Sequence, residues 1–318
     1  MSPVFNLILR RLLIGLITLW VVVTLIFFAV DLLPGDLSQN LLGQEATPEA
    51  IEALRRQLGL DRPLLVRYFE WANNILHGDL GKSLASGREI TELLSSRLAN
   101  TIFLASFAAI LAVPFSIFLG VLAALYRDRA YDKVVNFTTL TTMSFPDFFV
   151  AYVLIAFAST KLHLFPSMSM VDPSTPFWER VYRCTLPALT LTMLSAAHLM
   201  RMTRASIINL LASPYIEMAH LKGLKRARVI VGHALPNAIG PIVNVVAFNL
   251  AWLVVGIVIV EVVFTYPGLG QLLVDSVTKR DVPVVQACCL IFATTYILLN
   301  LLADLIAMAS NPRMLYPR

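Results

Sequence analysis

Hydrophobic residues along the chain gather into six long runs that polar segments separate. The first run, Leu12 to Val30, contains no charged residue and is bracketed by Arg10-Arg11 and Asp31. Since about 20 apolar residues span the ~30 Å hydrocarbon core of a bilayer, runs of this length predict transmembrane helices. The first run has no small-residue cleavage site, so we interpret it as a retained span rather than a signal peptide. The other runs lie at residues 100–126, 134–160, 186–203, 237–260 and 282–303.

The composition points to the same class of protein. Of the 318 residues, 58% are hydrophobic and only 14% are charged, and the mean hydropathy is +0.74. A soluble domain carries about 25% charged residues, so an ordinary cytosolic enzyme and a disordered protein are both excluded. Three cysteines without a CxxC pair exclude a disulfide scaffold. Because spans of this length suit helices rather than barrel strands, the sequence predicts an all-α polytopic membrane protein with six transmembrane helices.

The distribution of Lys and Arg predicts the orientation of these spans. Short cytoplasmic loops carry an excess of basic residues, and with both termini cytoplasmic the inner segments hold most of them. The long segment from Asp31 to Arg97 holds seven basic and ten acidic residues, but segments of this length cross largely regardless of charge. The predicted inner basic residues are Arg10, Arg11, Arg127, Arg129, Lys133, Arg201, Arg204, Lys222, Lys225, Arg226, Arg228, Arg313 and Arg318.

The long outer segment has the local signals of helices. Thr47-Pro48-Glu49 offers an N-cap, a proline at the first helical position and an acidic first turn, and Gly59 offers a C-cap. A second amphipathic stretch, Pro63 to Leu76, carries three aromatic residues. We expect a small helical extracytoplasmic segment after the first span. A role at the membrane surface is the alternative.

The predicted cytoplasmic loop between the fourth and fifth spans has the most specific pattern. Ser213 and Pro214 can begin a short helix, and Gly223 can end it in the left-handed conformation. A basic run follows and leads to Leu235-Pro236. The pattern predicts two short helices hinged at a glycine, which suits docking into a groove of a separate protein. The alternative is that the basic residues serve only topology.

This spacing resembles the EAA loop of ABC importer permeases. Glu217-Met218-Ala219, with Gly223 six residues after the glutamate and Leu235-Pro236 beyond, follows the family pattern, although Met218 replaces an alanine and His233 a branched aliphatic residue. In that family the loop inserts into a cleft on the ATP-hydrolysing subunit. The resemblance therefore implies an ATPase-coupling role for Glu217, Ala219, Lys222, Gly223, Leu235 and Pro236.

Further motifs resemble those of the oligopeptide and dipeptide permeases within this family, and they cover nearly the whole chain. Arg201-Met202-Thr203-Arg204 resembles the basic segment that leads into the coupling loop of these permeases. The remaining motifs are Leu33-Pro34-Gly35-Asp36, Gly59-Leu60-Asp61-Arg62-Pro63, Gly78-Asp79-Leu80-Gly81-Lys82-Ser83, Glu261-Val262-Val263-Phe264, Pro267-Gly268-Leu269-Gly270, Arg280-Asp281-Val282-Pro283 and, loosely, Asn311-Pro312-Arg313.

The resemblance implies a transport subunit of a prokaryotic inner membrane rather than an enzyme. Its implied partners are a homologous second permease, two ATP-binding subunits, an extracytoplasmic substrate-binding protein and the lipid bilayer, with no nucleic acid. ATP and Mg are expected on the partner subunits, and no cofactor or metal on this chain. The implied cargo is di- or oligopeptides, with nickel chelates, glutathione or oligosaccharides as alternatives for the same machinery.

The expected organisation has three parts. Residues 1–98 comprise the first span and the outer helical segment, and residues 99–310 form the permease core with the coupling loop at about 205–236. Residues 311–318 form a short cytoplasmic tail.

Asp147 is the acidic residue that interrupts the third run. Because a charge in a bilayer usually faces a polar cavity or a partner, Asp147 is a candidate for the translocation path. Alternatively the span begins later and Asp147 lies near an interface. Ser144, Asn244 and Asn249 are weaker candidates, since small and polar residues also mediate helix packing in lipid. Pro146 is expected to kink the helix.

Three other classes of function find little support. Gly81-Lys82-Ser83 lacks the first glycine of a P-loop, because Leu76 occupies that position. None of the five histidines stands in a metal-ligand spacing. An ion-coupled secondary transporter, the alternative to ATP-driven import, would be expected to show intramembrane charge pairs, and apart from Asp147 the runs hold almost none.

Overall fold

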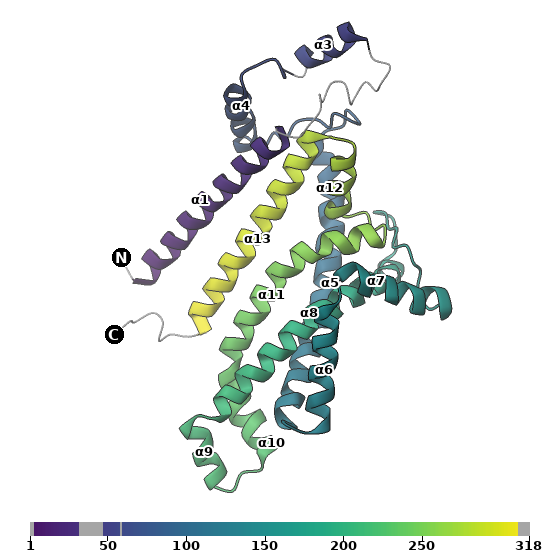
Figure 1. Cartoon of the computed structure of the whole chain (residues 1–318). Helices are drawn as coiled ribbons and strands as arrows, with labels where there is room; N and C mark the ends of the chain where they lie inside the picture. The colour runs from purple at the N-terminus through teal and green to yellow at the C-terminus, as the bar shows by residue number, and fades with distance from the viewer. Residues whose placement is uncertain (1–2, 32–46, 58, 311–318) are drawn as a thin grey trace. The chain divides into compact units, whose positions relative to one another are not determined.

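The structure is a computed structural model, and it describes residues 3–31, 47–57 and 59–310. The motif at residues 33–36 and the tail at 311–318 lie outside the described residues. The regular elements are helices, and one isolated bridge pairs Lys82 with Glu89. In chain order they are α1 (Pro3–Asp31), α3 (Pro48–Gln57), α4 (Leu64–Leu76), α5 (Ile90–Leu125), α6 (Ala130–Ser144), α7 (Asp147–Leu154), η1 (Ile155–Lys161), α8 (Phe177–Leu211), α9 (Pro214–Leu221), α10 (Arg226–Val229), η2 (Ile230–Ala234), α11 (Leu235–Val263), α12 (Leu269–Thr278) and α13 (Val282–Ser310), where η1 and η2 are π-helices (Figure 1).

Several of these helices are long and apolar enough to cross a membrane. In the described part of the chain α1, α5, α11 and α13 meet the requirement singly. The helix α6 and the following α7–η1 segment meet it only together, as a pair bent by 108°. The chain is therefore an all-α membrane protein with four such helices, or five if the bent pair counts as one span.

The expected fourth span coincides with α8, which is long enough but less apolar than the others. Several of its polar residues are buried against other helices, among them Thr190, Thr192 and Ser195. A helix surrounded by protein does not need the hydropathy of a lipid-exposed one. The six-span count therefore remains a prediction, as does the location of the termini.

The bend between α6 and α7 follows from proline chemistry. Proline disfavours the helical conformation of the residue before it, and Phe145 is accordingly extended at φ −90° and ψ 142°. Pro146 has no N–H to donate to the carbonyl of Thr142, which accepts instead from the Phe145 N–H at 3.3 Å. The predicted kink at Pro146 is confirmed, and it is a full break in the helix.

Contacts between residues group the chain into two units. The first comprises residues 1–15, 102–266 and 295–318, and the second comprises residues 16–101 and 267–294. In the first unit α8 packs along α11 and α6. Figure 1 shows α9 and α10 beyond the ends of α8 and α11, where the chain reverses.

In the second unit, aromatic side chains hold α4 against the C-terminal part of α1. The buried Tyr68 stacks on Phe28 with ring centroids 5.7 Å apart, and Trp71 lies 5.1 Å from the ring of Phe27. The hydroxyls of Tyr68 and Thr24 share a hydrogen bond of 2.8 Å. The segment after the first span thus contains helices, as expected, and its second helix is packed against α1. Its extracytoplasmic location remains a prediction.

The predicted caps of α3 are also present. The amide of Ala50 donates to the Thr47 hydroxyl at 3.3 Å, which is an N-cap contact. Gly59 has φ +65°, and the amide of Leu60 donates to the carbonyl of Arg55 at 3.0 Å. This six-to-one bond with a left-handed glycine is the Schellman arrangement.

The buried carboxylate of Asp281 fixes the loop that carries Gly81-Lys82-Ser83. It accepts hydrogen bonds from the Ser83 hydroxyl and from the amides of Leu84 at 3.0 Å and Ala85 at 3.3 Å. Lys82 pairs with Glu89 at 3.2 Å. Ser83 and Lys82 are therefore used in a structural turn.

Candidate functional site

The predicted coupling loop, at about residues 205–236, begins within the last two turns of α8, which ends at Leu211. The Ser213 hydroxyl donates to the carbonyl of Leu210 in the last turn of α8. Pro214 is the first residue of α9, where its missing N–H is not needed. The Ser213 carbonyl accepts from the amides of Ile216 at 3.0 Å and Glu217 at 3.2 Å, which starts the new helix.

Gly223 ends α9 in the left-handed conformation, as the sequence predicts. Its φ is +77°, and the amide of Leu224 donates to the carbonyl of Ala219 at 3.3 Å. A Cβ at this position would meet no atom within 4 Å. The turn therefore requires glycine for its backbone angle and not for space.

One face of α9 is fixed to the core of its own unit. Ile216 is fully buried and Ala219 is 7% exposed. Both belong to a cluster with residues of α5, α8, α10, η2 and α11, and the partly buried Leu224 and Leu235 pack against it. Ala219 thus lies against this chain's own core. The buried members of the cluster are Ala124, Ile207, Ile216, Ala219, Val229, Ala234, Ala238 and Ile242.

The opposite face of α9 is open. Tyr215, Met218 and Leu221 are 43%, 54% and 75% exposed, and Glu217 and Lys222 are exposed beside them. Glu217 lies in the first turn of α9, where the positive end of the helix dipole favours a carboxylate. The exposed face of α9 therefore presents an apolar patch, with Glu217 and Lys222 beside it.

After Gly223 the chain does not form a separate second short helix. The segments α10 and η2 lead directly into α11, whose N-terminal flanking residue, Ala234, is itself helical at φ −77° and ψ −49°. Leu235 is partly buried, while Pro236 is exposed in the first turn of α11, where proline is tolerated. The predicted glycine hinge is present, but its second arm is the beginning of a long helix.

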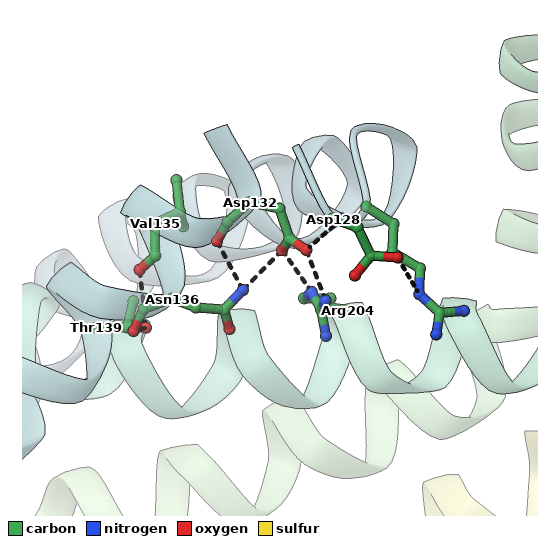
Figure 2. Close-up of polar contacts among 7 residues, drawn as sticks. Asp128, Asp132, Val135, Asn136, Thr139 and Arg204 are labelled. Carbon is green, nitrogen blue, oxygen red and sulfur yellow. Dashed lines mark hydrogen bonds and ion pairs between the residues drawn. The ribbon is translucent and has the colours of Figure 1, made fainter. Parts of the chain in front are cut away.

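An ion pair joins α6 to α8 two turns before the end of α8 (Figure 2). The Nε and Nη2 atoms of Arg204 each lie 2.7 Å from a carboxylate oxygen of Asp132. The same carboxylate accepts from the Asn136 amide at 2.7 Å and from the backbone N–H of Asp128 at 3.0 Å. The Asp132 side chain is only 4% exposed and that of Arg204 is 23% exposed. Sequence analysis gave Arg204 a topological role and did not identify Asp132 as its partner.

A second feature of the first unit is a cavity of about 590 Å³ beside the α6–α7 break. Its walls come from both sides of that break and from α8, α11 and α13. The α11 residues recur every three or four positions, which places them on one face of the helix. The lining residues are Thr142, Met143, Phe145, Asp147, Leu194, His198, Met202, Val245, Phe248, Asn249, Trp252 and Tyr296.

Two of the four path candidates from the sequence line this cavity. Asp147 and Asn249 are among its lining residues. Ser144 and Asn244 are not. The Ser144 hydroxyl donates to the carbonyl of Leu140 at 2.9 Å, and the Oδ1 atom of Asn244 is buried with no hydrogen-bond partner among the residues that the structure describes. Sequence reasoning missed Phe248 and Trp252, although both share the α11 face with Asn249. Over the described ranges, no three His, Cys, Asp or Glu side chains lie together as a metal site.

Comparisons with known proteins cover nearly the whole chain. The family described as "Binding-protein-dependent transport system inner membrane component" matches residues 116–316, and its N-terminal counterpart matches residues 4–105. The glutathione transport system permease protein GsiC of Escherichia coli (strain K12) is 38% identical over 312 residues, which is 98% of this chain and 99% of that protein. GsiC of Salmonella typhimurium (strain LT2) has the same identity and coverage.

The fold is similar to that of a solved membrane transporter. A chain of the MetNI methionine ABC transporter in an inward-facing conformation aligns with a TM-score of 0.50, covering 71% of this chain and 98% of that one. The two sequences are 18% identical, so this likeness concerns the fold alone.

Proposed function

The chain belongs to the family of inner-membrane permease components of binding-protein-dependent ABC importers, and from this premise we propose that it forms half of a translocation path for short peptides. It is a multi-pass inner-membrane transport subunit and not an enzyme. The proposed complex contains a homologous second permease, two ATP-binding subunits that carry ATP and Mg, and an extracytoplasmic binding protein. This chain itself holds no cofactor in the proposal.

We place six spans in the membrane with both termini in the cytoplasm. α8 supplies the additional span beyond the four apolar helices and the bent pair. The concentration of basic residues on the proposed inner side supports this orientation. It puts α9 and α10 in the cytoplasm and α3 and α4 outside.

The coupling proposal rests on one observation, the two unlike faces of α9. Ile216 and Ala219 hold the helix rigidly to the core, while Tyr215, Met218 and Leu221 remain exposed. A rigid helix with an exposed apolar patch and a charged residue is suited to bind a groove on the ATPase and to transmit its movement. Glu217 is the proposed polar anchor, and Gly223 sets the turn that keeps Lys222 at the end of the helix.

The substrate class comes from the relatives. The GsiC proteins are named as glutathione transport permeases, and glutathione is a small peptide. We therefore propose glutathione or related short peptides as cargo. Asp147 and Asn249 are the proposed path residues that the cavity supports, and Ser144 and Asn244 are retained as weaker candidates.

Charge reversal at Glu217 tests the coupling role. Purified complexes with candidate ATPase subunits are compared for the wild type, Glu217→Lys and the control Glu49→Lys. Both glutamates occupy the first turn of a proline-initiated helix, so the loss of helix-dipole stabilisation is matched. We expect Glu217→Lys to weaken ATPase association and uptake at least about tenfold and Glu49→Lys to leave association unchanged. Normal association and uptake with Glu217→Lys would exclude the coupling assignment.

A further inference from the structure

The cavity beside the α6–α7 break combines a single carboxylate with several aromatic rings. Asp147 is the one acidic side chain among the described lining residues. Phe145, Phe248, Trp252 and Tyr296 line the same space, each between 43% and 61% exposed. Phe145 stacks on Phe149 with ring centroids 4.7 Å apart, so one of its faces is already covered.

Asp147 has no partner within the described chain. No hydrogen bond or ion pair reaches its carboxylate from residues 3–31, 47–57 or 59–310. A Cβ added at Gly256 would lie 3.8 Å from Asp147 Oδ2, which places the carboxylate close to the backbone of α11. Because intramembrane charges usually face a partner, an unpaired carboxylate at this depth indicates a ligand.

The position of Asp147 in the first turn of α7 offers a simpler explanation, since a carboxylate there stabilises the helix dipole. An acidic residue at the start of any surface helix has this effect. It does not explain why aromatic side chains line the cavity beside Asp147. Arg201 lies near the cavity, but its guanidinium contacts the Sδ atom of Met143 at 3.5 Å and does not pair with Asp147. The carboxylate therefore remains available.

A carboxylate surrounded by aromatic faces is the environment that favours an organic cation. Ring quadrupoles attract ammonium groups, most strongly those of Trp, and the attraction grows when water is excluded. The volume of about 590 Å³ falls within the range of small-molecule sites.

We infer that this cavity binds the ammonium group of the cargo, with Asp147 as counter-ion and Trp252, Phe248 and Tyr296 as the aromatic walls. The inference rests on the proposed function, because it places the cation site on the import path. It also adds a selectivity step within the permease itself.

Ligand binding to the full chain in lipid nanodiscs tests this site without the ATPase. The probes are choline and its neutral isostere 3,3-dimethylbutan-1-ol, titrated by equilibrium dialysis into phosphatidylglycerol nanodiscs, which carry no ammonium headgroup. We expect saturable choline binding and at least about tenfold weaker binding of the isostere. Equal binding of the two probes, or no saturable choline binding, would overturn the inference.

Variants locate the site. Asp147→Asn is expected to weaken choline binding about tenfold, and Trp252→Ala about two- to fivefold. The control Asp172→Asn removes a charge from an exposed loop outside the cavity and is expected to change nothing. Asp147→Glu keeps the charge, and it is the variant to measure if Asp147→Asn does not fold. Unchanged binding in both Asp147→Asn and Trp252→Ala would contradict the inference.

Two further comparisons separate the possible outcomes. Weaker choline binding in phosphatidylethanolamine nanodiscs would mean that a lipid headgroup occupies the cavity, which would overturn the cargo assignment. ATPase association of Asp147→Asn is expected to be normal. If Glu217→Lys disproves coupling while choline binds as expected, the cation site stands and only the import function fails.

Discussion

Arg204 of α8 binds both carboxylate oxygens of Asp132 of α6, with two nitrogen–oxygen distances of 2.7 Å. The planar guanidinium matches a carboxylate in this bidentate way, which lysine does not reproduce. Arg204 lies one turn before Ile207, a member of the cluster that holds α9. The pair therefore fixes α6 to α8, the helix that leads into the proposed coupling loop.

Removing either partner is expected to destabilise the protein by about 3 kcal/mol, because the remaining charge stays largely buried. Thermal unfolding in detergent of Asp132→Asn, Arg204→Ala and the double variant gives the coupling energy of the pair. Arg56→Ala is the control; it breaks the exposed Arg56–Glu52 pair and is expected to change stability by less than about 1 kcal/mol. Additive effects of the two single substitutions would show that the pair is not coupled.

Gly223→Ala is expected to destabilise the turn after α9 by about 1–2 kcal/mol, since φ +77° is unfavourable for a residue with a Cβ. No atom obstructs the added methyl group, so the penalty is entirely conformational. The control is Gly232→Ala in η2, where a Cβ also meets nothing and φ is not positive. Hydrogen exchange of the α9 amides measures the effect, and equal exchange in the two variants would contradict it.

Gly120→Ala is expected to destabilise the packing of α5 on α8 by about 1–3 kcal/mol. A Cβ there would lie 2.8 Å from the backbone oxygen of Met200 and 2.8 Å from the Cβ of Thr203, neither of which can move alone. Gly15→Ala gives the contrast, because its nearest neighbour is a side-chain methyl of Ile297 at 3.3 Å. The thermal unfolding midpoints should fall more for Gly120→Ala; the reverse order would refute the predicted clash.

Ser83→Ala is expected to destabilise the loop at residues 81–85 by about 1.5–3 kcal/mol, because its hydroxyl donates to the buried carboxylate of Asp281. Asp281→Ala should have a larger effect, since the amides of Leu84 and Ala85 lose their acceptor as well. Hydrogen exchange of these two amides reports the loosening. Ser86→Ala, which removes the hydroxyl that donates to Ser83 at 2.8 Å from an exposed residue, is a milder comparison.

Local chemistry predicts much of this fold. The cap residues Thr47 and Gly59, the turn at Gly223 and the break at Pro146 all follow from the backbone preferences of the residues themselves, and the structure has each of them. Long apolar runs likewise predict α1, α5, α11 and α13, the described helices that are each long and apolar enough to cross a membrane. These features depend on neighbours within a few residues, so a single sequence is enough to find them.

Features that depend on tertiary contacts escape the same reasoning. Asp132 and Arg204 are 72 positions apart, and nothing near either residue indicates the pair. Buried polar residues of α8 pack against other helices, so the hydropathy of α8 is lower than expected for a membrane span. Trp252 and Tyr296 come from different helices, and only the fold brings them to the wall that Asp147 shares.

The corner at Pro146 also limits how this part of the chain sits in a bilayer. The 15 residues of α6 rise only about 22 Å, less than the ~30 Å of hydrocarbon, and the 15 residues of α7 and η1 are no longer. Neither arm alone reaches from one headgroup layer to the other. In the proposed six-span arrangement the two arms share one crossing, which puts the elbow at membrane depth. Irregular backbone there is tolerated only against protein or water, which turns this elbow away from the acyl chains and toward the interior of the transporter.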